Sequence, residues 1–275
     1  MQWQQWIMQH EPTIRLSCFF GIFALMAMVE VFAPKRKLTA GRGWRWLNNL
    51  ALVILNSVVV RLLFPTATVA VVLFTEQHQL GILRKIDFPP GTLVVLSVVL
   101  LDLAIYWQHR LFHSIPILWR LHRVHHADPD IDVTTAVRFH TVEIVLSMLI
   151  KFALIILLGP PLVAVVIFEV LLNGMAVFNH ANVRLPSGLD RVLRKLVVTP
   201  DMHRVHHSRI AREHNSNFGF NLSCWDRCFG SYTAQPEKGH TGMSIGLDSF
   251  TSTRQTCRLD GMLMIPFRNS ETQSR

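Results

Sequence analysis

Long apolar runs alternate with polar segments along this chain, and five of the runs predict helices that cross or enter a bilayer. They span residues 14–32, 47–74, 92–107, 144–158 and 162–177. About 20 apolar residues cross a membrane as a helix, and a shorter run can enter it partly. Arg61 and Pro65 interrupt the second run, and a short Gly-Pro-Pro turn joins the last two. The pattern predicts an all-α integral membrane bundle of about four to five transmembrane or re-entrant helices.

Five crossings would bring two distant polar segments to the same side of the membrane. Residues 109–140 follow the third run and residues 180–207 follow the fifth, and both segments are rich in histidine and arginine. Because cytoplasmic loops carry an excess of Lys and Arg, we expect this side to be cytoplasmic and to form a helical cap. The chain is expected to be one structural unit with three regions. These are membrane helices with their loops (1–91), a histidine-rich region (92–235) and a polar C-terminal tail (236–275).

Composition supports a membrane protein over a nucleic-acid-binding one. Only 16% of the 275 residues are charged, whereas about 25% is typical of soluble domains. The net charge of +9 comes from Lys and Arg that lie mostly between and after the apolar runs. No nucleic-acid-reading module is recognisable, so no nucleic-acid partner is expected. The four cysteines form no CxxC pair, and we expect neither a disulfide framework nor a cysteine zinc site.

Histidines form the most distinctive pattern, because the pentapeptide HRVHH occurs twice, at residues 122–126 and 203–207. In a helix, histidines three or four positions apart share a face, whereas adjacent ones diverge by roughly 100° and can reach two different ions. A tetrahedral zinc site needs four ligands at most, so the number of histidines favours a dinuclear centre. Spacing alone leaves iron, zinc, copper and nickel open. The nine candidate ligands are His109, His113, His122, His125, His126, His180, His203, His206 and His207.

Several further polar residues could add a ligand or orient the imidazoles through their second ring nitrogen. His140 stands apart from the repeated motifs and could be a ligand, an orienting group or part of a pocket wall. Asp102 and Glu169 lie inside apolar runs, where an ionisable group is costly, and a polar partner on a neighbouring helix is expected for each. The other candidates are Asp128, Glu143, Asp201 and Asp226.

Five segments of the chain together resemble the fatty acid hydroxylase/sterol desaturase superfamily, in its sterol-desaturase-like branch. They are DLAIYWQHRLFHSIPILWRLHRVHHAD (102–128), TAVRFHTVE (135–143), FNHANVRLP (178–186), TPDMHRVHHS (199–208) and NFGFNLSCWDRCFGSY (217–232). The resemblance implies an integral membrane enzyme with a non-haem di-iron site, and it makes region 92–235 the catalytic region. It also implies that the nine histidines bind two iron ions, for which zinc can substitute in preparations.

The resemblance departs from the family pattern at one position. Some members have a second histidine four residues after the one corresponding to His180, where this chain has Arg184. One metal would then lack a ligand, and His140, Asn182 or water could replace it.

The activity that the resemblance implies is O₂-dependent hydroxylation or desaturation of an unactivated C–H bond in a lipid of sterol, fatty-acyl or isoprenoid type. The sequence has no dinucleotide-binding motif, no cysteine cluster for an iron–sulfur centre and no evident haem domain. Electrons are therefore expected from a separate protein, a ferredoxin or a cytochrome with a reductase. Aromatic residues beside the histidines are expected to line the substrate pocket. They are Trp107, Phe112, Phe139 and Phe178.

Two other functions use histidine in membrane proteins. A metal transporter places its ligands near the bilayer midplane in broken helices, whereas the histidine motifs here lie at helix ends. A membrane zinc hydrolase needs a general base beside zinc-bound water, and the chain has no HExxH motif. The hypothesis of a dinuclear oxygenase site also makes a geometric prediction. The two HRVHH copies should face each other, with His125 and His126 next to His206 and His207.

Overall fold

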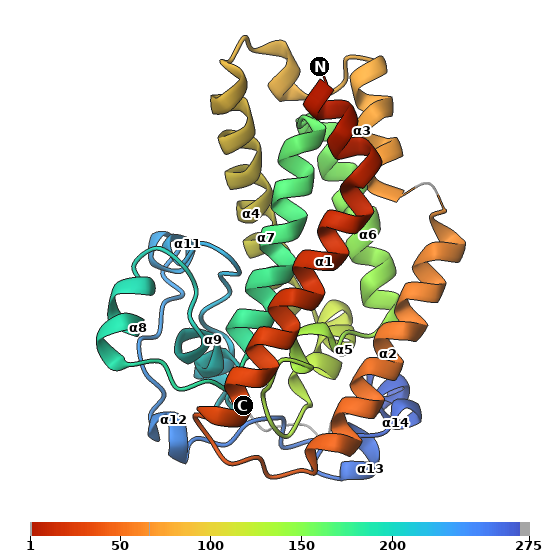
Figure 1. The fold of residues 1–275 in the computed structure, drawn as a ribbon. Helices are drawn as coiled ribbons and strands as arrows, with labels where there is room; N and C mark the ends of the chain where they lie inside the picture. Colours follow the sequence, from red (N-terminus) through yellow and green to blue (C-terminus); the bar gives the residue numbers. More distant parts are fainter. Residues whose placement is uncertain (1, 66, 270–275) are drawn as a thin grey trace.

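The computed structural model describes residues 2–65 and 67–269, and this part of the chain contains helices and isolated β-bridges but no strand. Figure 1 shows the long helices side by side in a tall bundle, with short helices gathered at one end. The helices of the bundle are α1 (Gln2–Phe32), α2 (Arg42–Leu63), α3 (Ala67–Gln77), α4 (Pro90–Ser114), α6 (Thr141–Leu158) and α7 (Leu162–His180).

Five segments of the bundle are long and apolar enough to cross a membrane, which agrees with the sequence prediction of an integral membrane protein. They are Gln9–Phe32, Arg42–Lys85, Pro90–Ser114, Thr141–Leu158 and Leu162–His180. The second of them contains both α2 and α3, which are separated at Pro65 because proline cannot continue a helical hydrogen-bond ladder. At 18 residues, α6 is about 27 Å long, which is long enough to cross most of a bilayer core.

The direction of the helices brings the two histidine-rich segments together. The chain runs towards the short helices in α1, α4 and α7 and away from them in α2, α3 and α6 (Figure 1). The connections after α4 and after α7 therefore lie at the same end, as predicted. We call residues 115–140 and 181–269 the cap. Its helices are α5 (Pro116–His126), α8 (Ser187–Leu193), α9 (Pro200–His206), α10 (Ala211–His214), α11 (Cys224–Cys228), α12 (Gly239–Gly242), α13 (Thr253–Thr256) and α14 (Leu259–Met264), with 3₁₀ turns η2 (Thr135–Val137) and η3 (Ile265–Phe267).

The end of the chain differs from the polar tail expected over 236–275. Met262 and Ile265 are fully buried, and they pack in one hydrophobic cluster with Leu52 of α2 and Val124 of α5. The apolar run over residues 262–267 is too short for a membrane helix and is surrounded by polar residues, so the sequence pattern did not mark it as part of the core. Residues 270–275 of the expected tail lie outside the described residues.

At the opposite end of the bundle, two turns meet backbone to backbone. Gly159 ends α6 with φ 67°, and Gly81 precedes the 3₁₀ turn η1 (Ile82–Lys85) with φ 107°. A Cβ added to Gly81 would lie 2.3 Å from the Gly159 nitrogen, so no side chain fits between the turns. Glycine also adopts these positive φ angles without strain. The contact fixes the α6–α7 turn against the connection that leads into α4.

Glu169 has the neighbouring-helix partners that its place in an apolar run predicted. Its carboxylate lies 2.6 Å from the Lys151 ammonium on α6 and 3.1 Å from the Arg15 guanidinium on α1, and it accepts a hydrogen bond from Thr68 on α3 at 3.2 Å. Opposite charges and a hydroxyl thus surround an acid that would be costly alone in a membrane. The cluster ties four helices together.

Candidate metal centre

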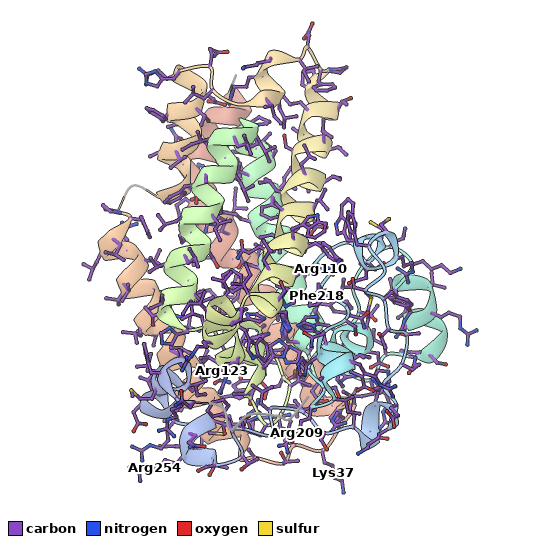
Figure 2. The ribbon with its side chains drawn as sticks, turned by 180° about the vertical axis from the view of Figure 1, so that it is seen from behind. Lys37, Arg110, Arg123, Arg209, Phe218 and Arg254 are labelled. Atoms are coloured by element: carbon purple, nitrogen blue, oxygen red, sulfur yellow. The ribbon has the colours of Figure 1, made fainter. Side chains whose placement is uncertain are left out.

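All nine candidate histidines converge at the junction of the bundle and the cap, in two groups that could each hold a metal ion. One ring nitrogen of every member lies within 4.8 Å of the corresponding nitrogens of its group. In Figure 2, side-chain nitrogens lie close together just below the label of Phe218, where the bundle meets the cap. The five-histidine group is His109, His113, His122, His126 and His206, and the four-histidine group is His125, His180, His203 and His207.

The two HRVHH copies face each other, and each contributes to both groups. The ring centroids of His125 and His207 are 4.7 Å apart, and those of His126 and His206 are 4.6 Å apart. The predicted neighbourhood is therefore confirmed. Because adjacent helical residues point in different directions, His125 and His126 enter different groups, and so do His206 and His207. The repeated motif thus joins the two groups instead of forming one group per copy.

In the five-histidine group, three rings have one nitrogen occupied by a hydrogen-bond acceptor. Nδ1 of His109 donates to the Phe218 carbonyl at 2.9 Å, and Nδ1 of His206 donates to the Ser216 carbonyl at 2.7 Å. Nδ1 of His122 lies 2.7 Å from the Glu143 carboxylate. A neutral imidazole that donates from Nδ1 carries its lone pair on Nε2. Outer partners of this kind fix the orientation of metal-binding histidines, which makes Glu143 a positioning residue.

In the four-histidine group, the same reasoning leaves lone pairs facing each other. Nδ1 of His125 donates to the Arg138 carbonyl at 3.3 Å, and Nδ1 of His180 donates to the Ala176 carbonyl at 2.7 Å. Their Nε2 atoms are nevertheless only 3.1 Å apart, and Nε2 of His203 lies 3.0 Å from that of His180. Two neutral rings that both donate elsewhere have no proton to share across this gap. A cation between the nitrogens relieves the repulsion, so these residues fit a bound metal.

The charge state of the rings suits metal binding as well. Burial lowers the pKa of His122 to about 3, and it also lowers the pKa values of His125, His126, His203 and His206 below their ordinary range. These rings are therefore neutral near pH 7, which is the form that binds metal. Nε2 of His122 and Nε2 of His206 are buried without a hydrogen-bond partner among the described residues. Buried polar atoms normally have a partner, and a metal ion would supply one here.

The candidates considered for an additional ligand are all occupied elsewhere. His140 caps α6 by accepting a hydrogen bond from the Val142 amide at 3.2 Å, and its other ring nitrogen faces the Leu263 carbonyl at 3.3 Å. The Asn182 side chain uses both polar atoms on the Arg36 backbone, at 3.1 and 2.8 Å. The side chain of Arg184 is exposed. Backbone groups therefore occupy the polar atoms of His140 and Asn182, and an additional ligand from either side chain stays a prediction.

Asp102 and Asp226 hold the loop that closes the histidine groups. The Asp102 carboxylate accepts hydrogen bonds from the Leu222 amide at 3.1 Å and from the Trp225 indole at 2.8 Å. Asp226 accepts from the Phe218 and Gly219 amides at 2.7 and 2.8 Å. Burial raises the pKa of Asp226 to about 6. Since Phe218 supplies the carbonyl that orients His109, both carboxylates support this loop, and neither belongs to a histidine group.

Asp201 likewise belongs to neither histidine group. It pairs with Lys35 at 2.6 Å and with Arg204 of the second HRVHH copy. These opposite charges lower its pKa, although burial alone would raise it. Its role is to fix α9 to the connection between α1 and α2.

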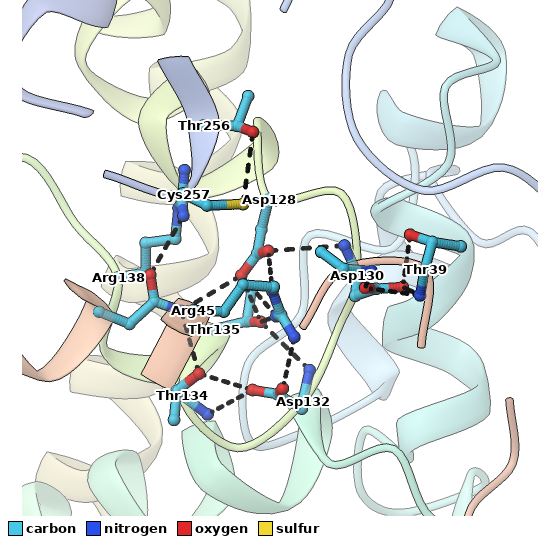
Figure 3. A network of polar contacts seen from close by, with 12 residues as sticks. Thr39, Arg45, Asp128, Asp130, Asp132, Thr134, Thr135, Arg138, Thr256 and Cys257 are labelled. Carbon is cyan, nitrogen blue, oxygen red and sulfur yellow. Dashed lines mark hydrogen bonds and ion pairs between the residues drawn. The ribbon is translucent and has the colours of Figure 1, made fainter. Parts of the chain in front are cut away.

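A buried ionic network supports the segment between His125 and His140 (Figure 3). Arg45 of α2 binds Asp128 at 2.8 Å and Asp132 at 2.7 Å, and Arg138 donates to the Asn49 side chain at 3.1 Å. Asp128, Asp130 and Asp132 resemble a calcium loop in spacing, but guanidinium, hydroxyl and amide groups occupy their oxygens. The network instead fixes the Arg138 carbonyl, which orients His125.

A cavity of about 220 Å³ extends from the histidines between α4, α6 and α7. Two predicted pocket residues, Phe112 and Phe139, line it. The other two do not: Trp107 is 40% exposed and packs on Phe229, with ring centroids 4.9 Å apart, and Phe178 is half-buried elsewhere. The cavity is lined by Ile105, Gln108, His109, Phe112, His122, His125, Ala136, Phe139, Glu143, Ile144, Ser147, Leu172, Asn173, Ala176, His203 and Phe220.

Sequence reasoning missed the polar residues of this cavity. Gln108 of α4 donates to Ser147 of α6 at 2.9 Å, and Asn173 lies on α7. A signal existed, because Ser147 is four residues after Glu143 and Asn173 is seven before His180, so each shares a helix face with a residue of the site.

Comparison with known proteins gives a consistent result. Residues 94–231, half of the chain, match the fatty acid hydroxylase family. An ornithine lipid hydroxylase from Rhizobium tropici is 28% identical over 234 residues, which cover 82% of this chain and 69% of the relative. Alkylglycerol monooxygenases from Xenopus tropicalis and Homo sapiens are each 31% identical over 149 residues, which cover 54% of this chain and about a third (32%) of each relative. No solved structure matched the chain.

Proposed function

The chain belongs to the fatty acid hydroxylase family and is an oxygen-dependent lipid hydroxylase of the membrane, and we propose that its nine converging histidines hold two iron ions. The observation that carries the proposal is the short contact between Nε2 atoms of His125 and His180, whose other nitrogens both donate to carbonyls. Two irons bound there would supply activation of O₂ and removal of hydrogen from a C–H bond. The histidines lie at the ends of the membrane helices, and not at their midpoints as in a transporter.

The protein's own contribution is to hold the ligands and to keep the reacting carbon away from water. Glu143, together with the Phe218, Ser216 and Arg138 carbonyls, fixes the orientation of four rings. Phe139 stacks on His125 at a centroid distance of 4.6 Å and shields it. Rigid support of this kind places each ligand before substrate binds, which is the requirement for a precise reaction site.

The cavity fits part of a lipid and not a whole one. Its volume of about 220 Å³ is below the roughly 300–1,000 Å³ of pockets that enclose a drug-sized ligand. We propose that an alkyl segment enters laterally from the bilayer while the rest of the lipid stays outside. The named relatives act on an ornithine lipid and on alkylglycerols. A membrane lipid with a polar head and a long alkyl chain is therefore the proposed substrate class.

We propose that the cap faces the cytoplasm. Lys35, Arg36 and Lys37 lie at the cap end of α1 and α2, and the cap carries most of the other basic residues, whereas Arg84 and Lys85 lie at the opposite end. A maleimide that cannot cross membranes tests this assignment on a variant whose only cysteine is Cys228, which is exposed. Labelling is expected only after the cells are opened. Labelling of intact cells would reverse the orientation.

We also propose that a separate acidic redox protein, a ferredoxin or cytochrome with its reductase, supplies the electrons. Exposed Lys37, in the connection between α1 and α2, and exposed Arg254 of the cap both lie at the cap end of the molecule (Figure 2). A basic face accelerates association with an acidic partner, and the effect weakens with salt. Turnover with a reduced acidic ferredoxin should therefore fall as ionic strength rises, and turnover that is independent of salt would contradict this assignment.

The reaction itself is tested with ¹⁸O₂. Membranes that contain the protein should incorporate ¹⁸O into a lipid when O₂ and reductant are present, and the His125→Ala variant should not. His78→Ala is the matched control, because His78 is exposed at the opposite end of the bundle. A labelled product that forms equally with His125→Ala would reject the histidine site. Metal flux through liposomes without O₂ consumption would favour a transporter.

A further inference from the structure

The two copies of HRVHH use their arginines in different ways. Arg204 of the second copy pairs with the Asp201 carboxylate. Arg123 of the first copy donates to backbone carbonyls, those of Ile265 at 2.7 Å and Arg268 at 2.6 Å. Arg120, one turn earlier, donates to the Pro266 carbonyl at 2.8 Å. Within the described residues, neither Arg120 nor Arg123 forms an ion pair.

Two guanidinium groups thus share one wall of a second cavity, and no carboxylate of residues 2–65 or 67–269 pairs with them. This cavity measures about 300 Å³ and is lined by Pro116, Trp119, Arg120, Arg123 and Asn269. Carbonyl oxygens satisfy hydrogen bonds, but they do not cancel positive charge. Burial and the neighbouring Arg120 charge lower the pKa of Arg123 to about 10, so it stays cationic near pH 7. Paired arginines beside an aromatic ring are typical of sites that bind phosphate.

The surroundings of the cavity indicate that its ligand comes from the membrane. Pro116 follows the last residue of α4, Ser114, by only two positions, so the cavity lies where a membrane helix ends. Large apolar side chains near it in sequence are exposed, with Ile117 at 67% and Phe267 at 66%. Figure 2 shows Arg123 at the cap end of the bundle, near the C-terminal helices. Basic pockets at the ends of membrane helices suit anionic lipid head groups.

We propose that the Arg120–Arg123 pocket binds the phosphate of an anionic phospholipid, at a site distinct from the histidine groups. The Trp119 ring connects the two sites, because its centroid lies 4.9 Å from that of His113 and 5.4 Å from that of His126. It also stacks on His214 at 5.6 Å. A lipid held by the two arginines would fix α5 and with it one side of the five-histidine group.

Native mass spectrometry of the detergent-purified full chain with added phosphatidylglycerol tests the proposal. The wild type should retain one lipid per chain, and Arg120→Gln should bind it about 10-fold or more weakly, as expected from losing a charged hydrogen bond. Arg254→Gln, which removes an exposed arginine elsewhere on the cap, is the matched control. Unchanged metal content and melting temperature in Arg120→Gln would show that the fold is intact. Equal retention by wild type and Arg120→Gln, or equal loss in Arg254→Gln, would overturn the proposal.

Competition by other ligands and one further variant identify the ligand. Phosphatidylcholine and inorganic phosphate should compete weakly, because the first carries a compensating cation and the second lacks an apolar anchor. Displacement of the lipid by millimolar phosphate would replace the lipid assignment with that of a soluble anion. Glu271 follows the lining residue Asn269 by two positions in the sequence and lies outside the described residues, and Glu271→Gln should leave lipid retention unchanged. Retention that appears only in Glu271→Gln would show that the pocket takes a carboxylate of the same chain, and would reject the lipid site.

Discussion

Glu143 offers a graded test of how the five-histidine group is held. Its carboxylate lies 2.7 Å from Nδ1 of His122, and both side chains are buried. Glu143→Gln keeps a side-chain oxygen that can accept from Nδ1 of His122, and Glu143→Ala removes the acceptor. Because a buried donor without an acceptor is costly, the two variants should differ.

The size of the effect follows from the role of such outer partners. Losing one typically lowers metal affinity about 10- to 100-fold. We expect roughly 10-fold for Glu143→Gln and roughly 100-fold for Glu143→Ala, which correspond to about 1.4 and 2.7 kcal/mol. Only one of the two metals should be affected, because the acceptors of the four-histidine group, the Arg138 and Ala176 carbonyls, remain in place.

The assay is an anaerobic competition titration of iron against a chelator, with metal content measured after each step. Glu76→Gln is the control, because Glu76 pairs with Arg84 at 3.2 Å at the opposite end of the bundle. Equal affinity in wild type and Glu143→Ala would refute the assignment of Glu143 as a positioning residue. Equal weakening of both metals would refute the division into two groups.

Three further predictions concern acid, the buried network and the cavity. The pKa of His122 is lowered from 6.5 to about 3 in the folded protein, so below pH 6.5 the unfolded chain binds a proton that the folded protein does not, and the fold loses stability as the pH falls towards 3. The melting temperature and the amount of bound metal should therefore fall together below about pH 6.5. Constant values down to pH 4 would contradict this. Arg45→Ala leaves Asp128 and Asp132 without their guanidinium partner and should cost about 3–5 kcal/mol in unfolding free energy; a loss under 1 kcal/mol in denaturant titration would refute the role of this network. Ala176→Phe should fill the cavity and lower activity at least 10-fold with metal content unchanged; full activity towards long-chain lipids would show that the substrate binds elsewhere.

Much of this architecture could be predicted from the sequence, because membrane helices and metal ligands leave local patterns. The interruption at Pro65 and the divergence of His125 from His126 both follow from helix geometry. The assignment of each histidine to its group could not be predicted. It depends on how α5 and α9 are oriented against each other, which spacing within either helix does not specify.

For Trp107, a predicted pocket residue, and for His140, helix periodicity does not specify which tertiary contacts the side chain makes. Trp107 and Gln108 are adjacent on α4, but only Gln108 faces the cavity. Periodicity shows that their directions differ by roughly 100°, but not which of them points inward. His140 lies close to the other histidines in sequence, yet backbone groups occupy both of its ring nitrogens. Which polar groups a side chain finds is decided by tertiary contacts that involve residues as distant as Leu263.

The metal content of the protein, loaded with iron under anaerobic conditions, tests the central claim most directly. The two histidine groups predict about two irons per chain in the wild type and about one in His180→Ala, which removes a ligand from the four-histidine group only. The remaining iron should stay bound to the five-histidine group. A wild type that binds a single iron, or a His180→Ala variant that keeps the full wild-type content, would contradict the account.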